Sequence, residues 1–252
     1  MQAEERHFLI EQHLQKLEFA SLEELSEKVD VSVSTVRRDL TLLETKGTIR
    51  RTHGGARLVT PKSDEFAFTA RDTHQLSEKD AIGQAAAELV QPNQGVIVDA
   101  GTTAYHVAKH LGGKASHIIT NSLPVANHFG SDNSVEVLVT GGVIYPRLGV
   151  LVGPLAVESL SKMHADVAIM SGGGITMDGI TNSHALLIDI QRAMLQSAQR
   201  IIFCLDHTKF NRRSVSPLCE LNAIDTIVTD AQAPADLVEQ LKQTNTQVVV
   251  AN

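Results

Sequence analysis

The chain has 252 residues and a formal net charge of −7; 42% of its residues are hydrophobic and 20% are charged, as in ordinary soluble proteins of one or two domains. No apolar run approaches the roughly 20 residues of a membrane-spanning helix, and the amino-terminal segment does not resemble a secretory signal. Two cysteines are too few for a disulfide framework or a metal cluster, so we expect a cytoplasmic protein without a membrane partner, metal or cofactor.

The acidic net charge is unevenly distributed along the chain. Residues 34–57 hold six basic residues and two acidic ones, whereas residues 58–252 hold 13 Lys and Arg against 19 Asp and Glu. Charges farther apart than about 8–10 Å are screened at physiological salt, so a phosphate backbone senses the local basic patch and not the net charge. The distribution therefore leaves nucleic acid open as a partner.

Three helices are predicted in the first 45 residues. The first spans about residues 3–17, and its apolar side comprises Phe8, Leu9, Leu14 and Leu17. Ser21 followed by Glu24 is the pattern of a capping box, which starts a second helix that ends near Val29. Ser32 caps the third helix, whose core side comprises Val33, Val36, Leu40 and Leu43.

The outer side of the third helix is polar and basic. It comprises Ser34, Thr35, Arg37, Arg38 and Thr41. Two short strands follow at residues 48–52 and 56–59, around a His53-Gly54-Gly55 turn, and the first carries Arg50 and Arg51. A helix-turn-helix followed by a basic hairpin predicts a winged-helix domain over residues 1–59 that binds double-stranded DNA. The predicted DNA-binding residues are Ser32, Ser34, Thr35, Arg37, Arg38, Arg50, Arg51 and His53.

Residues 60–76 are polar with isolated apolar residues and are predicted to form a linker, from which Phe66 and Phe68 could dock on one of the domains. Residues 77–252 alternate β-branched apolar runs with amphipathic segments, which indicates an α/β domain with a mainly parallel sheet. The predicted strands are 95–100, 117–120, 135–140, 166–170, 200–205, 225–229 and 247–251, and the predicted helices include 103–111, 122–129, 185–198 and 234–243.

The segment VSVSTVRRDLTLLETKGTIRRTHGGA resembles the DNA-binding signature of the DeoR family of bacterial sugar-metabolism repressors. The resemblance implies a second, Rossmann-like domain that is similar to ribose-5-phosphate isomerase and binds a phosphorylated sugar or related metabolite. It also implies a regulator, most simply a repressor and not an enzyme. Because helix-turn-helix proteins usually span two half-sites, we expect a homodimer or homotetramer.

Four loops after predicted strands are candidates for the effector site, because ligands of open α/β sheets bind outside the carboxyl ends of the strands. Asp99 and Gly101-Thr102-Thr103 lead into a helix, whose amino end favours anions. The other candidates on these loops are Asn121, Gly141, Gly142, Arg147, Gly172 and Gly173. Asp206-His207-Thr208-Lys209-Phe210 matches a family element, in which Lys209 could neutralise a phosphate or pair with Asp99 or Asp206.

The chain departs from the family pattern at one place, since Ala185 and Leu186 occupy positions where polar residues are expected. Asn182 and His184 could substitute for them, and the departure suggests a less polar or differently shaped ligand. Two rival functions remain: a sugar-phosphate isomerase fused to a DNA-binding module, with Asp99, Asp206 and Lys209 in catalysis, and a protein-interaction module with a vestigial pocket.

Overall fold

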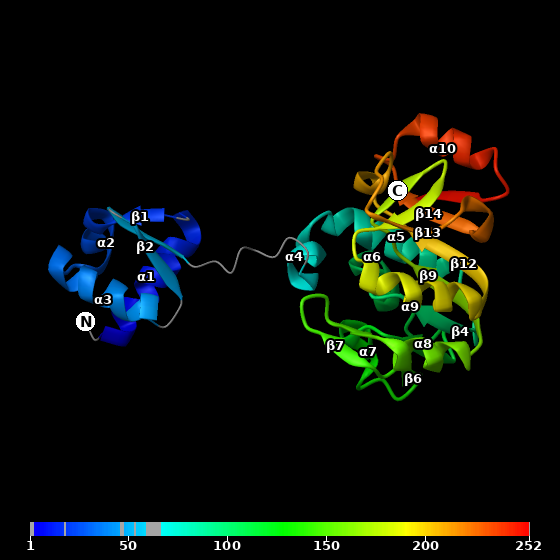
Figure 1. Cartoon of the computed structure of the whole chain (residues 1–252), viewed down its shortest axis with the longest axis horizontal. Coiled ribbons are helices and arrows are strands. Elements are labelled where there is room, and N and C mark those ends of the chain that lie inside the picture. Colours follow the sequence, from blue (N-terminus) through cyan, green and yellow to red (C-terminus); the bar gives the residue numbers. More distant parts are fainter. Residues whose placement is uncertain (1–2, 18, 46–47, 53, 59–66, 252) are drawn as a thin grey trace. The chain divides into compact units, whose positions relative to one another are not determined.

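The structure is a computed structural model that describes residues 3–17, 19–45, 48–52, 54–58 and 67–251 (Figure 1). The chain divides into two compact units, residues 1–65 and 66–252, and each is considered by itself. None of the helices in the described ranges has the length and apolar character needed to cross a lipid bilayer.

The amino-terminal unit has the element order of a winged helix. It comprises α1 (Ala3–Leu17), β1 (Phe19–Ser21), α2 (Leu22–Val29), α3 (Val33–Thr45), β2 (Ile49–Thr52) and β3 (Gly55–Leu58). The three strands form one antiparallel sheet in the order β1-β3-β2. The predicted capping box is confirmed, because the Glu24 amide donates to Ser21 Oγ and the Ser21 amide donates to Glu24 Oε2. Strand β1 was not predicted from the sequence.

One prediction for α1 is wrong. Phe8, predicted on the apolar side, is 59% exposed, whereas Ile10 and Leu14 are fully buried and His7 is buried at 8% exposure. These three buried residues lie at positions i, i+3 and i+7, so the buried face includes a histidine. The side chain of Leu17 lies outside the described residues. The reason for the buried His7 is its pairing with Asp39 on α3, described below.

The carboxyl-terminal unit begins with two helices, α4 (Phe68–Thr73) and α5 (Leu76–Glu88). Residues 68–73, which were predicted to be linker, are therefore helical, and α4 packs on α6 (Thr102–Lys109). Phe68 meets Tyr105 of α6 edge to face, with ring centroids 5.4 Å apart, which confirms that it docks. Phe66 lies outside the described residues.

A parallel sheet of seven strands organises this unit. Its order is β15-β14-β12-β9-β4-β5-β6, and every neighbouring pair is parallel. The strands are β4 (Gly95–Val98), β5 (His117–Thr120), β6 (Glu136–Val139), β9 (Ala165–Met170), β12 (Ala198–Cys204), β14 (Thr226–Asp230) and β15 (Gln247–Ala251). All seven predicted strands are present, which confirms the α/β prediction.

Helices cover both faces of the sheet because side chains alternate along each buried strand. On one face, Val96, Val98 and Cys204 pack with α5, α6 and α7 (Leu123–Phe129). On the other, Ile97 and Phe203 pack with α8 (Pro154–Ser161), α9 (Ala185–Gln196) and α10 (Ala235–Lys242). The result is a three-layer arrangement, visible in the right-hand part of Figure 1.

Two small antiparallel sheets decorate the unit and were not predicted. One pairs β7 (Val143–Tyr145) with β8 (Val150–Val152). The other has the order β10-β11-β13, formed by Gly174–Thr176, Gly179–Asn182 and Ser216–Cys219. Short 3-10 turns at His207–Lys209 and Leu221–Ala223 complete the described elements.

Candidate nucleic-acid interface and ligand site

The exposed face of α3 presents the predicted recognition residues. Ser34, Arg37 and Arg38 are exposed and Thr35 is half-buried, while Val36, Leu40 and Leu43 on the opposite face are buried. Burial of the apolar side of this amphipathic helix thus orients both arginines outward. The side chains of Arg37 and Arg38 make no hydrogen bond or ion pair with other described residues, so their guanidinium groups are available to bases or phosphates.

The first turn of α3 is organised by hydroxyl groups. The Thr35 amide donates to Ser32 Oγ over 3.3 Å, which confirms Ser32 as the cap of this helix. Ser32 Oγ also lies 2.8 Å from Ser34 Oγ and 3.0 Å from Thr35 Oγ1. The helix amino terminus therefore ends in an exposed group of three hydroxyls, a suitable contact for phosphate.

A buried ion cluster holds α3 in place. Asp39 is only 3% exposed and accepts hydrogen bonds from Arg6 Nε at 2.7 Å and Arg6 Nη2 at 3.0 Å, and it lies 3.0 Å from His7 Nε2. Burial alone would raise the pKa of Asp39, but the hydrogen bonds from Arg6 and His7 outweigh it and lower the pKa. Asp39 thus points into the unit and ties α3 to α1, while its neighbour Arg38 points out.

The hairpin carries two arginines, of which only Arg51 forms side-chain bonds with described residues. Arg50 and Arg51 are both exposed on β2. Arg51 Nε lies 2.9 Å from Glu44 Oε2, and its Nη1 donates to Thr41 Oγ1 over 2.8 Å, so it already links β2 to α3. Arg50 has no such bond among the described residues. The predicted DNA contact His53 lies outside the described residues.

The candidate ligand site lies at the switch point of the parallel sheet. From β4 the chain proceeds through β5 to β6 on one side. The next strand of this sheet, β9, lies on the other side of β4. Such reversals leave a crevice at the carboxyl ends of the strands. Asp99 follows β4 and Ser171 follows β9, so both lie where the topology places a ligand.

Asp99 is the centre of a buried hydrogen-bond network. Asp99 Oδ2 accepts from the Ser171 amide at 3.1 Å, from Ser171 Oγ at 2.8 Å and from Gln191 Nε2 at 2.8 Å. Burial raises the pKa of Asp99, although these donors oppose the shift. Asn182 Nδ2 donates in turn to Gln191 Oε1 over 2.8 Å. Asn182, which was predicted to compensate for Ala185 and Leu186, is therefore part of the network.

Gln191 was not among the residues predicted from the sequence. It is 1% exposed on the buried face of α9, between Leu187 and Met194. A polar residue on the apolar face of an amphipathic helix is a sequence signal, but its partner Asp99 is 92 residues away in the chain. Its role follows only from the folded contact.

The loop after Asp99 opens α6. Gly101 is the residue before the helix, and Thr102 and Thr103 form its first turn with 5% exposure each. No described residue hydrogen-bonds to either threonine hydroxyl. A Cβ at Gly101 would lie 1.7 Å from Ser171 Oγ, so only glycine lets this loop approach the Asp99 network.

The loops after β5 and β6 are held by backbone contacts. Asn121 is fully buried, and its Nδ2 donates to the Leu151 carbonyl over 3.1 Å, which fixes the β7–β8 hairpin beside β5. Gly141 and Gly142 have φ values of +70° and +117°, a backbone region that favours glycine. The exposed Arg147 lies in the turn between β7 and β8, and its carbonyl accepts from the Phe68 amide over 3.2 Å.

Gly172 and Gly173 follow Ser171 and lead into β10. A Cβ at Gly172 would lie 2.8 Å from Ile180 Cγ2, and one at Gly173 would lie 2.8 Å from Ser214 Oγ. Close packing against Ile180 of β11 and against Ser214 therefore accounts for the two glycines, whatever part they take in ligand binding.

Lys209 lies in a rigid loop after β12. The His207 amide donates to Asp230 Oδ2 over 2.7 Å, and Phe210 is buried, so the loop is fastened at two points. Lys209 Nζ lies 3.8 Å from Asp206 Oδ2, a long contact that leaves its donors available. Burial lowers the pKa of Lys209, and Arg212 and Arg71 lower it further while Asp206 raises it.

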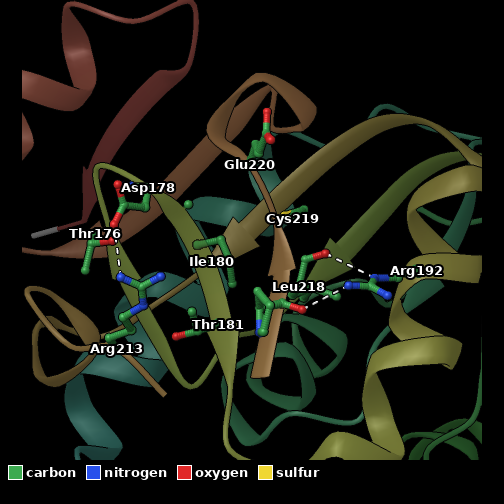
Figure 2. Close-up of a pocket in the computed structure, with 11 residues that line it drawn as sticks. Thr176, Asp178, Ile180, Thr181, Arg192, Arg213, Leu218, Cys219 and Glu220 are labelled. Atoms are coloured by element: carbon green, nitrogen blue, oxygen red, sulfur yellow. Dashed lines mark hydrogen bonds and ion pairs between the residues drawn. The ribbon is translucent and has the colours of Figure 1, made fainter. Parts of the chain in front are cut away.

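A separate hollow of about 350 Å³ lies on the small sheet (Figure 2). Its lining includes Asp178, Arg192 and Arg213, none of them a predicted site residue. Arg192 donates to the Pro217 and Leu218 carbonyls, and Arg213 pairs with Asp178 at 3.4 Å. Both arginines thus bond to groups that line the hollow. None of the residues proposed for the switch-point site lines it. No group of three potential metal-ligating side chains gathers within the described ranges.

The amino-terminal unit thus has a winged-helix arrangement with a basic exposed face, and the α/β unit has a candidate ligand site at the switch point of its sheet. Residues 6–62 match the DeoR-like helix-turn-helix domain, and residues 74–231 match the DeoR C terminal sensor domain. The chain belongs to the DeoR family of transcriptional regulators.

Relatives of similar length support the assignment. The chain is 33% identical to the HTH-type transcriptional regulator GolR of Listeria innocua, over 90% of this chain and 91% of that one. It is 35% identical to the HTH-type transcriptional repressor GlcR of Bacillus subtilis, over 95% and 94%. It is 32% identical to the L-fucose operon activator of Haemophilus influenzae, over 92% and 93%.

Solved structures show a weaker likeness. Ribose 5 phosphate isomerase A from Neisseria gonorrhoeae is 16% identical, with a TM-score of 0.36 over 56% of this chain and 54% of that one. This level of likeness carries no argument about the site.

Proposed function

We propose that the protein represses a carbohydrate-metabolism operon from the cytoplasm and that a phosphorylated sugar or related metabolite controls its binding to operator DNA. The relative from Haemophilus influenzae is named for control of an L-fucose operon, which supports carbohydrate control, and GlcR is named as a repressor, which supports repression. Repression is the simpler mechanism, because a bound winged helix blocks the DNA that it covers.

Operator binding would use the exposed face of α3 and strand β2. Arg37 and Arg38 are free to form bidentate contacts to guanine or to grip phosphates, and Arg50 is free to hold the backbone. The proposed DNA-binding residues are Ser32, Ser34, Thr35, Arg37, Arg38, Arg50, Arg51 and His53. Arg51 would contribute less, because Glu44 already neutralises it.

Effector binding would use the switch-point edge. The observation that carries this proposal is the pair of buried threonines, Thr102 and Thr103, whose hydroxyls have no described partner at the amino end of α6. Lys209 would supply the charge that neutralises a phosphoryl group. The full proposed set is Asp99, Gly101, Thr102, Thr103, Asn121, Gly141, Gly142, Arg147, Gly172, Gly173 and Lys209. Leu186, which is 60% exposed at the start of α9, would present an apolar surface to the ligand.

We also propose that the protein is a sensor without catalytic turnover. A general base needs a carboxylate that is free to accept a proton from the substrate. Asp99 Oδ2 instead accepts three hydrogen bonds within the protein, from Ser171 and Gln191. An aldose–ketose turnover assay on pentose and hexose phosphates tests the point, and turnover above the uncatalysed rate would reinstate the isomerase alternative.

The proposed assembly is a homodimer or a homotetramer. A second copy of the chain is the occupant that fits the apolar surface formed by Val139, Val143, Ile144 and Leu155, which are 43%, 69%, 54% and 59% exposed. These residues lie on β6, which is an edge strand of the sheet, on β7 and at the start of α8. Two winged helices in one assembly would match the two half-sites of an operator.

The effector proposal is tested by operator release in the presence of a panel of sugar phosphates. Thr102→Val and Lys209→Met should leave operator affinity intact and abolish release, because each removes a group that would hold the phosphate. Lys242→Met, an exposed lysine on α10, is the control and should respond as the wild type does. Full release from both site variants would refute the assignment of the site.

A further inference from the structure

Arg71 on α4 has an unusual environment for an arginine. Its side chain is half-buried, and its Nε atom is fully buried with no hydrogen-bond partner. No hydrogen bond or ion pair with any other described residue reaches its guanidinium group. A guanidinium taken out of water without a partner destabilises the fold, so the position requires another reason.

Helix α4, which carries Arg71, is attached to α6 and to the turn between β7 and β8. Phe68 packs edge to face on Tyr105, Asp72 Oδ1 lies 3.2 Å from His106 Nε2, and the Phe68 amide donates to the Arg147 carbonyl. Tyr105 and His106 belong to α6, the helix that begins with Thr102. Arg71 is thereby fixed relative to the loop that opens α6 and to the β7–β8 turn.

Arg71 is influenced by charged residues of the proposed switch-point site, namely Asp99 and Lys209. Its own pKa is lowered by burial and raised by the charge of Asp99. Its charge in turn lowers the pKa of Lys209, after the larger effects of burial, Asp206 and Arg212. Lys79 Nζ donates to the Arg71 and His74 carbonyls, which places a third cation in the same group.

The carboxylates of the group do not satisfy these cations. Asp99 Oδ2 already accepts from Ser171 and Gln191, and Asp206 Oδ1 accepts from the Thr208 amide and hydroxyl. Lys209 reaches Asp206 only at 3.8 Å. The guanidinium donors of Arg71 and the hydroxyls of Thr102 and Thr103 thus have no partner among the described residues, and Lys209 has only its long contact with Asp206.

We propose that Arg71 is an anion-binding residue that acts with Lys209 to hold the phosphoryl group of the effector. The proposal rests on the proposed function and adds the helix α4 to a site that the sequence pattern confined to strand ends. A dianionic phosphate monoester is the ligand class that fits, because a planar guanidinium matches two phosphate oxygens and an uncharged sugar would leave the cations unpaired.

The position of Arg71 also gives the chain a way to report the ligand. Helix α4 is the first described element after residue 58, so it lies closest in sequence to the DNA-binding unit. A phosphate that binds Arg71 would stabilise the state in which α4 is docked on α6 over the state in which it is not. The free energy of phosphate binding would shift the equilibrium between these two states.

The test uses the full chain in phosphate-free buffer and follows thermal unfolding by tyrosine fluorescence, since both tyrosines, Tyr105 and Tyr145, lie in the sensor unit. The probes are inorganic phosphate, glucose 6-phosphate, ribose 5-phosphate and the free sugars. Arg71→Met is compared with Arg71→Lys and with the control Arg200→Met. Arg200 is also half-buried, but it lies on β12 away from the carboxyl end and donates to the Leu89 carbonyl.

Without ligand, Arg71→Met should melt at or above the wild-type temperature, because an unpaired buried charge is removed. With the phosphorylated probe that stabilises the wild type, its affinity should be roughly ten- to hundredfold weaker, and Arg71→Lys should lie between the two. A lower melting temperature of Arg71→Met without ligand, together with an unchanged affinity, would show a structural arginine and overturn the proposal.

Each remaining outcome is also decisive. If the wild type responds to a phosphorylated probe and Arg71→Met responds equally, the role of Arg71 is refuted while the sensor function stands. If no phosphorylated probe stabilises the wild type, the proposed function and this inference fall together. If free sugars act as well as their phosphates, the dianion assignment is wrong.

Discussion

At the scale of single residues, the arginines of the amino-terminal unit differ in how they are engaged. The guanidinium groups of Arg37, Arg38 and Arg50 form no hydrogen bond or ion pair with the described residues, whereas Arg51 is paired with Glu44 and bonded to Thr41. The sequence alone does not distinguish them, because their spacing and charge are alike. The folded contact with Glu44, seven residues away and across the start of the hairpin, separates them.

Arg38→Ala should weaken operator binding by about 1–3 kcal/mol, the value of a good bidentate base contact. Arg51→Ala should cost less, because part of the Arg51 charge is already neutralised. Fluorescence anisotropy with an operator selected from a random DNA pool measures both, and Lys162→Ala, an exposed lysine of the sensor unit, is the control. Equal affinity of Arg38→Ala and wild type would remove Arg38 from the recognition face.

The burial of Lys79 has a consequence for the pH dependence of stability. Burial lowers its pKa to about 8, Asp206 and Asp72 oppose the shift, and Lys209 and Arg71 add to it. In the unfolded chain its pKa is about 10.4. Below pH 8 both states carry the proton and the full cost of burying the charge is present; as pH rises from 8 toward 10 the folded state loses its proton first, and stability is regained.

Urea unfolding of wild type and Lys79→Met between about pH 7.5 and 9.5 checks this prediction. The wild type should gain stability relative to Lys79→Met as pH rises. Lys79→Met also loses the hydrogen bonds to Arg71 and His74, so its stability at any one pH is not the test. Parallel pH profiles of the two proteins would contradict the assigned burial of the charge.

At the scale of elements, the sequence predicted those features that depend on local pattern. All seven strands of the parallel sheet, the capping box of α2 and the cap of α3 were predicted, because periodicity and capping chemistry act over a few residues. The failures are long-range. Phe8 was placed on the buried face of α1, although the face is chosen by the contact of Arg6 and His7 with Asp39, more than 30 residues away.

The same reason limits the prediction of the ligand site. The loops after β4, β5, β6 and β9 could be predicted because parallel strands end at one edge. Gln191 and Arg71 could not, because Gln191 bonds to Asp99 from α9 and Arg71 on α4 is influenced by the charge of Asp99, and the docking of neither helix has a local signature. Whether Gly172 and Gly173 contact ligand stays a prediction, since packing against Ile180 and Ser214 already accounts for them.

The attachment of α1 to α3 can be tested through Asp39→Asn. The substitution keeps the shape but leaves Arg6 without its carboxylate, at a cost of about 1–3 kcal/mol. Because the pKa of Asp39 is lowered on folding, its contribution is complete above about pH 4 and is lost as pH falls through the folded pKa. The difference between variant and wild type should therefore shrink below about pH 4.

Circular dichroism reports helices of both units, whereas tyrosine fluorescence reports only the sensor unit, and the chain has no tryptophan. Asp39→Asn should lower the first melting transition seen by circular dichroism and leave the tyrosine transition unchanged. A shift of both transitions would mean that the two units do not unfold independently.

The loop before α6 is tested by Gly101→Ala. The added Cβ would lie 1.7 Å from Ser171 Oγ, so Ser171 must move and its hydrogen bond to Asp99 is lost. We expect the tyrosine transition to be destabilised by about 1–3 kcal/mol and the effector response to vanish. Gly112→Ala is the control, because a Cβ there meets nothing within 4 Å. Wild-type stability and response in Gly101→Ala would contradict the close approach.

At the scale of the whole molecule, the exposed apolar surface on β6, β7 and α8 predicts self-association. Ile144→Asp should shift the protein toward the monomer in sedimentation velocity, because a charge within an apolar interface is costly. Operator affinity should fall with it, since two linked half-sites bind more tightly than one. Val215→Asp places the same charge at a residue that is 88% exposed elsewhere and should change neither property. An unaltered sedimentation coefficient in Ile144→Asp would place the interface elsewhere.

Each apolar cluster among the described residues lies within one of the two units. The cluster of Ile10, Leu25, Leu40 and their neighbours lies wholly in the first unit, and the two clusters on the faces of the large sheet lie wholly in the second. Within the described ranges, no apolar cluster of one unit includes a side chain of the other. The two units should therefore be exchangeable between relatives. A hybrid that joins residues 1–58 to the sensor unit of another family member should keep the operator specificity of this protein and respond to the effector of the other.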